Sequence, residues 1–256
     1  GGIRIPTVSD AIDRTDDNPF QAFKAYLPQA YPAIYSRLDT LTINEYGLVF
    51  RWPGKNPALP PILLCSHYDV VPVLNYDPSA PDAPLPGWDY PPFSGAVADG
   101  RIYGRGTLDM KGMLFSILEA TDSLLAEGFR PERDVWIALG FDEETGGTQG
   151  ALKIARYFEE QGIAFDAVYD EGGIIIAPGL GGIQRTAALV GTAEKGFSTI
   201  RITVRGTGGH SSMPPEKGSL VLAAEIIEML NQERMPAFLT APVIAFLDRI
   251  GGSMGV

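Results

Sequence analysis

Cysteine, long apolar runs and basic residues are all scarce in this sequence. Its 256 residues include a single cysteine, Cys65, which excludes an internal disulfide framework, so stability must come from packing or from metal. No apolar run approaches the roughly 20 residues that a membrane-spanning helix needs, and no signal segment opens the chain. These two features favour the cytoplasm, but the start at Gly1-Gly2 predicts a missing N-terminus and leaves the compartment open.

The shortage of basic charge bears on the partners that we expect. The chain has 20 Lys and Arg against 31 Asp and Glu, which gives a formal net charge of −11. A nucleic-acid partner is therefore not expected, because phosphate binding needs a basic surface. The 45% of apolar residues excludes a wholly disordered chain, and the length allows one large domain or two smaller ones.

Short apolar segments alternate with helical patterns from about residue 61 onward. Buried strands are predicted at 62–65, 135–141 and 166–169, and helices at 20–27, 111–127 and 149–161. A long proline-rich loop over 72–100 separates the first strand from the next helix. Strands that alternate with helices predict an α/β fold with a mainly parallel sheet flanked by helices.

The pattern changes near residue 190. Ile200, Ile202 and Val204 alternate with polar residues and predict a half-exposed strand, and an apolar helix is predicted from Ser219 to Leu230. We therefore expect two domains, over residues 1–190 and 191–256.

Imidazole and carboxylate side chains follow each of the three predicted strands. His67 and Asp69 follow the first strand, the acids at 142–144 follow the second, and the acids at 170–171 follow the third. Asp109 lies in a fourth segment, before the helix at 111–127, where it could also serve as a helix N-cap. Taken singly, His67 could be a structural histidine and the acids at 142–144 a solvated loop.

A parallel sheet would bring all four segments to one edge, because the carboxyl ends of its strands meet there. Imidazole and carboxylates without thiolate suit Zn, Mn or Co, and a bridging carboxylate fits a two-metal centre. An aspartate two residues after a histidine can hold the imidazole in place as a metal ligand.

Five motifs in this sequence resemble the M20 metallopeptidases, a family of dizinc amidohydrolases. They are HYDVVPV, GRGTLDMKG, FDEETGG, YDEGG and GGHSSMPP. The stretch from EKGFSTIRITVRG onward and the PPFSG loop are most similar to the branch of carboxypeptidase S, Gly-Xaa carboxypeptidases and N-acyl-amino-acid hydrolases. The resemblance implies a three-layer α/β/α catalytic domain of the zinc-exopeptidase type, followed by the start of a smaller α+β lid and dimerisation domain.

The resemblance also implies roles for individual residues. His67, oriented by Asp69, would bind one zinc ion, and Asp109 would bridge two zinc ions, for which Co or Mn could substitute. Glu143 would be the general base and Glu144 a ligand of the second metal.

Two further roles concern the later motifs. Glu171, with Asp170 as the alternative, would complete the first metal's ligands. His210 would be the lid-domain histidine that stabilises the oxyanion, and the lid domain would allow a homodimer.

The implied activity is metal-dependent hydrolysis of amide bonds in short peptides or N-acyl amino acids. The family has a second histidine ligand late in the chain, and no histidine follows His210 here. We therefore expect this sequence to be a fragment with doubtful activity of its own. The alternative is a non-catalytic relative that retains a metal-binding or dimerisation role.

Overall fold

The computed structural model describes residues 1–9, 18–179, 182–192, 196, 198–206, 208–210, 212–213, 215 and 217–251. The chain divides into two compact units, Gly1–Glu171 and Gly172–Val256. Among the described residues, no helix has both the length and the apolar character needed to cross a membrane.

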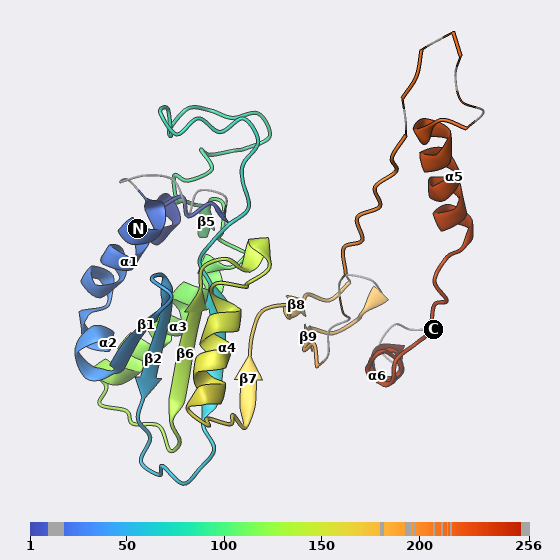
Figure 1. Cartoon of the computed structure of the whole chain (residues 1–256). Coiled ribbons are helices and arrows are strands. Elements are labelled where there is room, and N and C mark those ends of the chain that lie inside the picture. Colours follow the sequence, from blue (N-terminus) through green and yellow to red (C-terminus); the bar gives the residue numbers. More distant parts are fainter. Residues whose placement is uncertain are drawn as a thin grey trace. The chain divides into compact units, whose positions relative to one another are not determined.

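A five-stranded sheet forms the centre of the first unit (Figure 1). Its strands, in spatial order, are β1 (Asp39–Ile43), β2 (Gly47–Trp52), β6 (Val135–Gly140), β3 (Ile62–His67) and β7 (Ala167–Tyr169). β3 pairs in parallel with β6 and β7, whereas β2 pairs antiparallel with β1 and β6. Four of the five strands therefore run in one direction, which confirms the predicted α/β fold with a mainly parallel sheet.

Helices cover both faces of this sheet. They are α1 (Pro19–Ala30), α2 (Pro32–Arg37), α3 (Lys111–Ala126) and α4 (Ala151–Glu160). α3 connects β3 to β6, and α4 connects β6 back across β3 to β7. Because such crossovers are right-handed, the reversal of direction places α3 and α4 on opposite faces.

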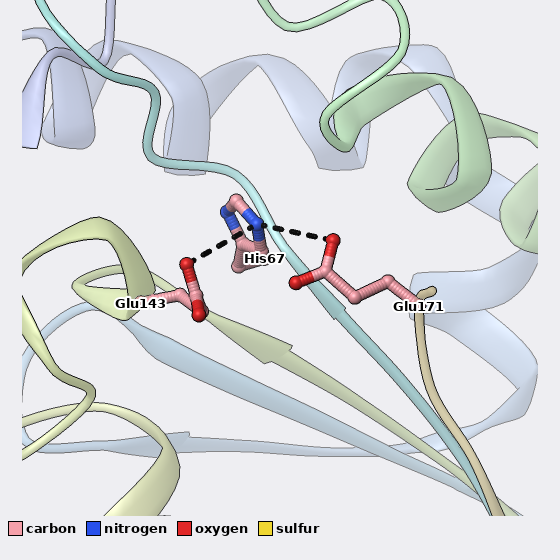
Figure 2. Close-up of side chains that lie close together, drawn as sticks. All are labelled: His67, Glu143 and Glu171. Carbon is pink, nitrogen blue, oxygen red and sulfur yellow. Dashed lines mark ion pairs between the residues drawn. The ribbon is translucent and has the colours of Figure 1, made fainter. Parts of the chain in front are cut away.

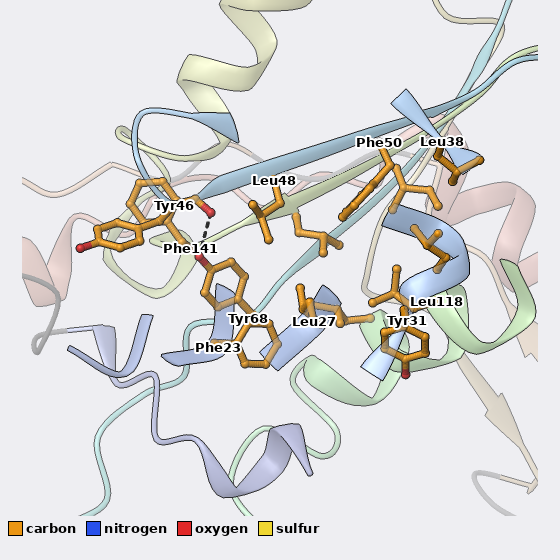
Figure 3. Packing of buried hydrophobic residues seen from close by; sticks show 14 of the residues in the cluster. Phe23, Leu27, Tyr31, Leu38, Tyr46, Leu48, Phe50, Tyr68, Leu118 and Phe141 are labelled. Carbon is orange, nitrogen blue, oxygen red and sulfur yellow. Dashed lines mark hydrogen bonds between the residues drawn. The ribbon is translucent and has the colours of Figure 1, made fainter. Parts of the chain in front are cut away.

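The core has two parts because alternate strand residues face opposite sides of the sheet. Leu48 and Phe50 of β2 pack with buried residues of α1, α2 and α3, and Figure 3 shows this cluster. Val49, between them, packs on the other face with Ile154 and Phe158 of α4. Both faces of β2 are thus buried, and a three-layer α/β/α unit results.

Several elements were not predicted. The hairpin of β1 and β2 extends the sheet, η1 (Gly2–Arg4) lies near the N-terminus, and β4 (Ala96–Ala98) pairs with β5 (Arg101–Tyr103) at the end of the long loop. These elements are short, and β2 lacks an alternating pattern because both its faces are buried. The β-prone run from Leu48 to Trp52 was the available signal.

The second unit contains β8 (Ile174–Ile176) paired antiparallel with β9 (Ala187–Leu189), then α5 (Ser219–Gln232) and α6 (Ala241–Gly251). The strand predicted around Ile200 to Val204 was wrong. Over the described residues 198–206 the backbone forms no strand, because no described segment pairs with it, and Ile200 is 80% exposed. The boundary expected near residue 190 falls inside this unit and stays a prediction.

Candidate metal centre

The register of the sheet brings His67 and the acidic segments after β6 and β7 to one edge of the sheet. His67, the last residue of β3, pairs with Gly140, the last residue of β6. Tyr169, the last residue of β7, pairs with Leu64 of β3. The acidic segments that follow β6 and β7 therefore leave the sheet beside His67, as expected for parallel strands.

The His67 ring lies among three carboxylates. Its Nε2 atom is 3.2 Å from Oδ1 of Asp109, 3.7 Å from Oε2 of Glu171 and 3.8 Å from Oε2 of Glu143. Figure 2 shows the ring between the two glutamates. The His67 side chain is only 4% exposed, and Nε2 has no hydrogen-bond partner among the described residues. A buried imidazole nitrogen that faces carboxylates in this way needs a proton or a cation.

The other ring nitrogen of His67 faces Asp69. Nδ1 lies 3.0 Å from the Asp69 carbonyl oxygen and 3.2 Å from Oδ1 of its fully buried carboxylate. That carboxylate also accepts hydrogen bonds from the backbone N–H groups of Glu143 (3.1 Å) and Glu144 (3.0 Å). Asp69 therefore holds both the histidine and the acidic segment after β6.

Asp109 does not cap α3. The N-cap residue is Met110, without a side-chain capping bond, and α3 begins at Lys111. The Asp109 carboxylate instead lies against His67 and is 67% exposed.

Asp142 is the first of three consecutive acids, and it does not join the cluster. Its carboxylate accepts hydrogen bonds from the backbone N–H groups of Gln149 and Gly150, both at 2.7 Å. A Cβ atom at position 150 would lie 2.5 Å from Asp142 Oδ1, so glycine is needed for this close approach. These hydrogen bonds join the two ends of the loop that carries Glu143 and Glu144 and thereby stabilise it.

The electrostatics favour a bound cation. Burial by itself lowers the pKa of the His67 imidazole, but the hydrogen bond and charge of Asp69, together with two nearby glutamates, raise it to about 9 from its ordinary 6.5. Burial also raises the pKa of the carboxyl groups of Glu143, Glu144 and Glu171, and the charges of neighbouring carboxylates raise it further. A cation among these groups would relieve the repulsion that raises their pKa values.

Two groups of side chains could each hold a metal ion. One consists of His67, Glu143 and Glu171, and the other of His67, Asp109 and Glu144, with the ligand atoms of each group within 4.8 Å of one another. The donors are one imidazole and carboxylates, a set that suits Zn, Mn or Co. The residues present therefore fit a metal.

The remaining predicted residues lie elsewhere. The Asp170 carboxylate accepts a hydrogen bond from the Glu171 N–H at 2.9 Å and belongs to neither group. His210 lies in the second unit, is exposed, and its Nδ1 is 2.8 Å from Ser212 Oγ.

Two residues near the cluster were missed from the sequence. Ser9 Oγ lies 3.1 Å from Oδ2 of Asp69. Lys111 is fully buried, and its Nζ donates to the Ile5 carbonyl oxygen at 2.7 Å and lies 5.0 Å from the Phe23 ring centroid. Burial lowers the pKa of this lysine to about 7. No local pattern marks Ser9, because its partner is 60 residues away.

Comparison with known proteins places the chain in a family. Residues 63–248 match the model of Peptidase family M20/M25/M40. The chain is 39% identical over 238 residues to the N-fatty-acyl-amino acid synthase/hydrolase PM20D1 of Xenopus tropicalis, which covers 92% of this chain and 44% of that protein. It is 36% identical over 236 residues to carboxypeptidase S of Saccharomyces cerevisiae, which covers 88% of this chain and 40% of that protein.

A solved structure, the M20 family metallo-carboxypeptidase Sso-CP2 from Sulfolobus solfataricus, superposes with a TM-score of 0.49 at 23% identity, over 67% of this chain and 35% of that one. The chain spans less than half the length of the two curated relatives. The family model covers well over half of the chain, and the curated relatives match it along most of its length, so this chain belongs to peptidase family M20/M25/M40.

Proposed function

We propose that this chain supplies ligands to the dizinc centre of a hydrolase that cleaves amide bonds in short peptides or N-acyl amino acids. Family membership implies a metal cofactor. The observation that supports the proposal most directly is the buried Nε2 of His67, which has no hydrogen-bond partner among the described residues and faces three carboxylates. The names of the relatives, an N-fatty-acyl-amino acid synthase/hydrolase and a carboxypeptidase, suggest the two substrate classes.

The chain's own residues divide between two metal positions. We assign His67 and Glu171 to the first metal, Glu144 to the second, and Asp109 to a bridge between them. Asp109 suits the bridge because its carboxylate is the most exposed of those around His67. The hydrogen bond at His67 Nδ1 leaves Nε2 as the ligand atom.

Glu143 is assigned as the general base. When bound, divalent metal ions would supply Lewis acidity that makes a water molecule a better nucleophile at neutral pH. The raised pKa of the Glu143 carboxyl group suits it to accept a proton from that water and pass it to the leaving amine. The bond between its own N–H and Asp69 fixes its backbone, while its side chain, 51% exposed, is free to turn toward substrate.

His210 would stabilise the developing oxyanion, and the second unit would supply the lid and a dimer contact. These roles come from the family resemblance alone.

Replacement of the two adjacent glutamates tests the assignment. We expect Glu143→Ala to keep zinc affinity and to abolish any hydrolysis of an N-acyl amino acid or a dipeptide that the wild-type chain shows. We expect Glu144→Ala to lose zinc. Zinc titration of both variants, with the exposed Glu132→Ala as the matched control, measures this. Loss of zinc from Glu143→Ala alone would show that the two glutamates are reversed. A wild-type chain that binds no zinc would refute the proposed function.

A further inference from the structure

The N-terminal segment lies directly behind the candidate metal centre. Val8 forms a parallel bridge with Val70, the Val70 N–H donates to the Thr7 carbonyl oxygen at 2.9 Å, and the Ser9 N–H donates to the Val70 carbonyl oxygen at 3.1 Å. These backbone bonds place the Ser9 side chain beside the carboxylate of Asp69. Thr7 is fully buried and Ser9 is 6% exposed, so this pairing is shielded from water.

The Ser9 hydroxyl has two acceptors within reach but only one proton. Its Oγ is 3.1 Å from Asp69 Oδ2 and 3.1 Å from the Val70 carbonyl oxygen. The bond to the carboxylate is the stronger because its acceptor is charged. The carbonyl oxygen already accepts the N–H of Ser9, whereas the fully buried carboxylate needs every donor it can obtain.

Asp69 consequently has donors from three parts of the chain. Oδ1 faces the His67 ring and accepts the Glu143 N–H, and Oδ2 accepts the Glu144 N–H and the Ser9 hydroxyl. Ser9 is the donor that reaches this carboxylate from the N-terminal segment, which is separate in the chain from the segments that carry His67, Glu143 and Glu144. Without it, only the acidic segment itself would determine where Oδ2 lies.

We propose that Ser9 is a positioning residue of the metal centre, which acts through Asp69 on His67 and on the segment that carries Glu143 and Glu144. The proposal rests on the proposed function, because it assigns Ser9 to the support of the same zinc ligands. Groups that hydrogen-bond directly to metal ligands contribute about tenfold or more to metal affinity, and Ser9 supports such a group, Asp69.

The test compares Ser9→Ala with Thr7→Val in the full 256-residue chain. Thr7 is the matched control because its hydroxyl donates to the Tyr68 carbonyl oxygen, in the same pairing, without contacting Asp69. We expect Ser9→Ala to weaken zinc binding about tenfold, measured by competition with a chromophoric chelator, and to alter the absorption spectrum of bound Co²⁺. Thr7→Val should leave both readouts unchanged, although its unfolding midpoint in urea falls.

The possible outcomes separate the two proposals. A wild-type chain without zinc affinity refutes the proposed function and this inference together. Zinc affinity and a Co²⁺ spectrum in Ser9→Ala that equal those of the wild type refute the role of Ser9 alone. An equal loss of zinc affinity in Thr7→Val also refutes it, because the effect would then reflect general loosening of the N-terminal segment.

Discussion

Replacement of Asp69 by asparagine tests the central claim about the architecture of the site. The change keeps the size of the side chain and replaces a carboxylate that only accepts hydrogen bonds with an amide that has one acceptor and one donor end. Backbone N–H groups face both carboxylate oxygens, that of Glu143 at Oδ1 and that of Glu144 at Oδ2. Whichever way the amide turns, its NH₂ group must therefore meet an N–H donor.

The magnitude follows from this mismatch. One hydrogen bond to a charged, buried acceptor is lost, and the remaining bonds of Asp69 lose their charged acceptor. Such a bond contributes about 1.5–3 kcal/mol, so we expect the free energy of unfolding to fall by about 3 kcal/mol. Zinc affinity should fall between about tenfold and a hundredfold, because His67 and the segment after β6 lose their common support.

A matched control separates stability from metal binding. Asp134 also accepts a backbone N–H, that of Gly54 at 2.7 Å, and a side-chain donor, the Arg51 Nε at 2.8 Å. It directly precedes β6, at the opposite end of the strands from the metal centre. Asp134→Asn should lower the free energy of unfolding by a similar amount without changing zinc affinity.

Urea unfolding monitored by circular dichroism and zinc titration of both variants provide the two measurements. Unchanged zinc affinity in Asp69→Asn would refute the reasoning, because the substitution removes the carboxylate that His67, Glu143 and Glu144 share as an acceptor. Equal loss of zinc in Asp134→Asn would show that zinc affinity only reports general stability.

Two further predictions concern protonation and packing. Zinc affinity should rise about tenfold per pH unit between pH 6 and 8, because the His67 imidazolium, with a pKa of about 9, must lose a proton before Nε2 can bind metal; titrations with a constant affinity would contradict this. In the metal-free chain, the pKa of His67 is about 9 in the folded state and 6.5 in the unfolded state. The protonated imidazole therefore stabilises the fold fully below pH 6.5, and this contribution is lost as the pH rises through 9. The difference in the free energy of unfolding between wild type and His67→Asn, measured in urea at each pH, tests this. Phe23→Ala should lower the free energy of unfolding by about 3–5 kcal/mol, because this fully buried ring stacks on the Tyr68 ring with the ring centroids 4.6 Å apart. The control Val97→Ala, at a site 76% exposed, should change it little. Equal effects of the two substitutions would contradict the packing.

Much of the fold could be predicted from local patterns. The buried strands that became β3 and β6 and the helices that became α3 and α4 were predicted within two residues of their ends, because apolar spacing and Gly or Pro boundaries are local properties. β2 was missed because burial on both faces removes its alternation. The strand predicted near Ile200 failed because alternation alone does not supply a pairing partner.

The sequence by itself determined which chemical groups could meet. A histidine and acids at the ends of three successive strands must share one edge once those strands are parallel, and the five motifs pointed to the family. The first inference needed only residue order and strand direction, and the second rested on the resemblance of the five motifs to the family.

Only the tertiary structure decided where each acid lies and which groups it contacts. Asp142 accepts the Gly150 N–H and does not join the cluster. Asp109 lies against His67 and does not cap a helix. Ser9 adds a hydrogen bond to Asp69. The physical reason is range: Asp69 meets its partners across 60 to 75 residues of chain, and such contacts depend on how the layers pack rather than on any local pattern.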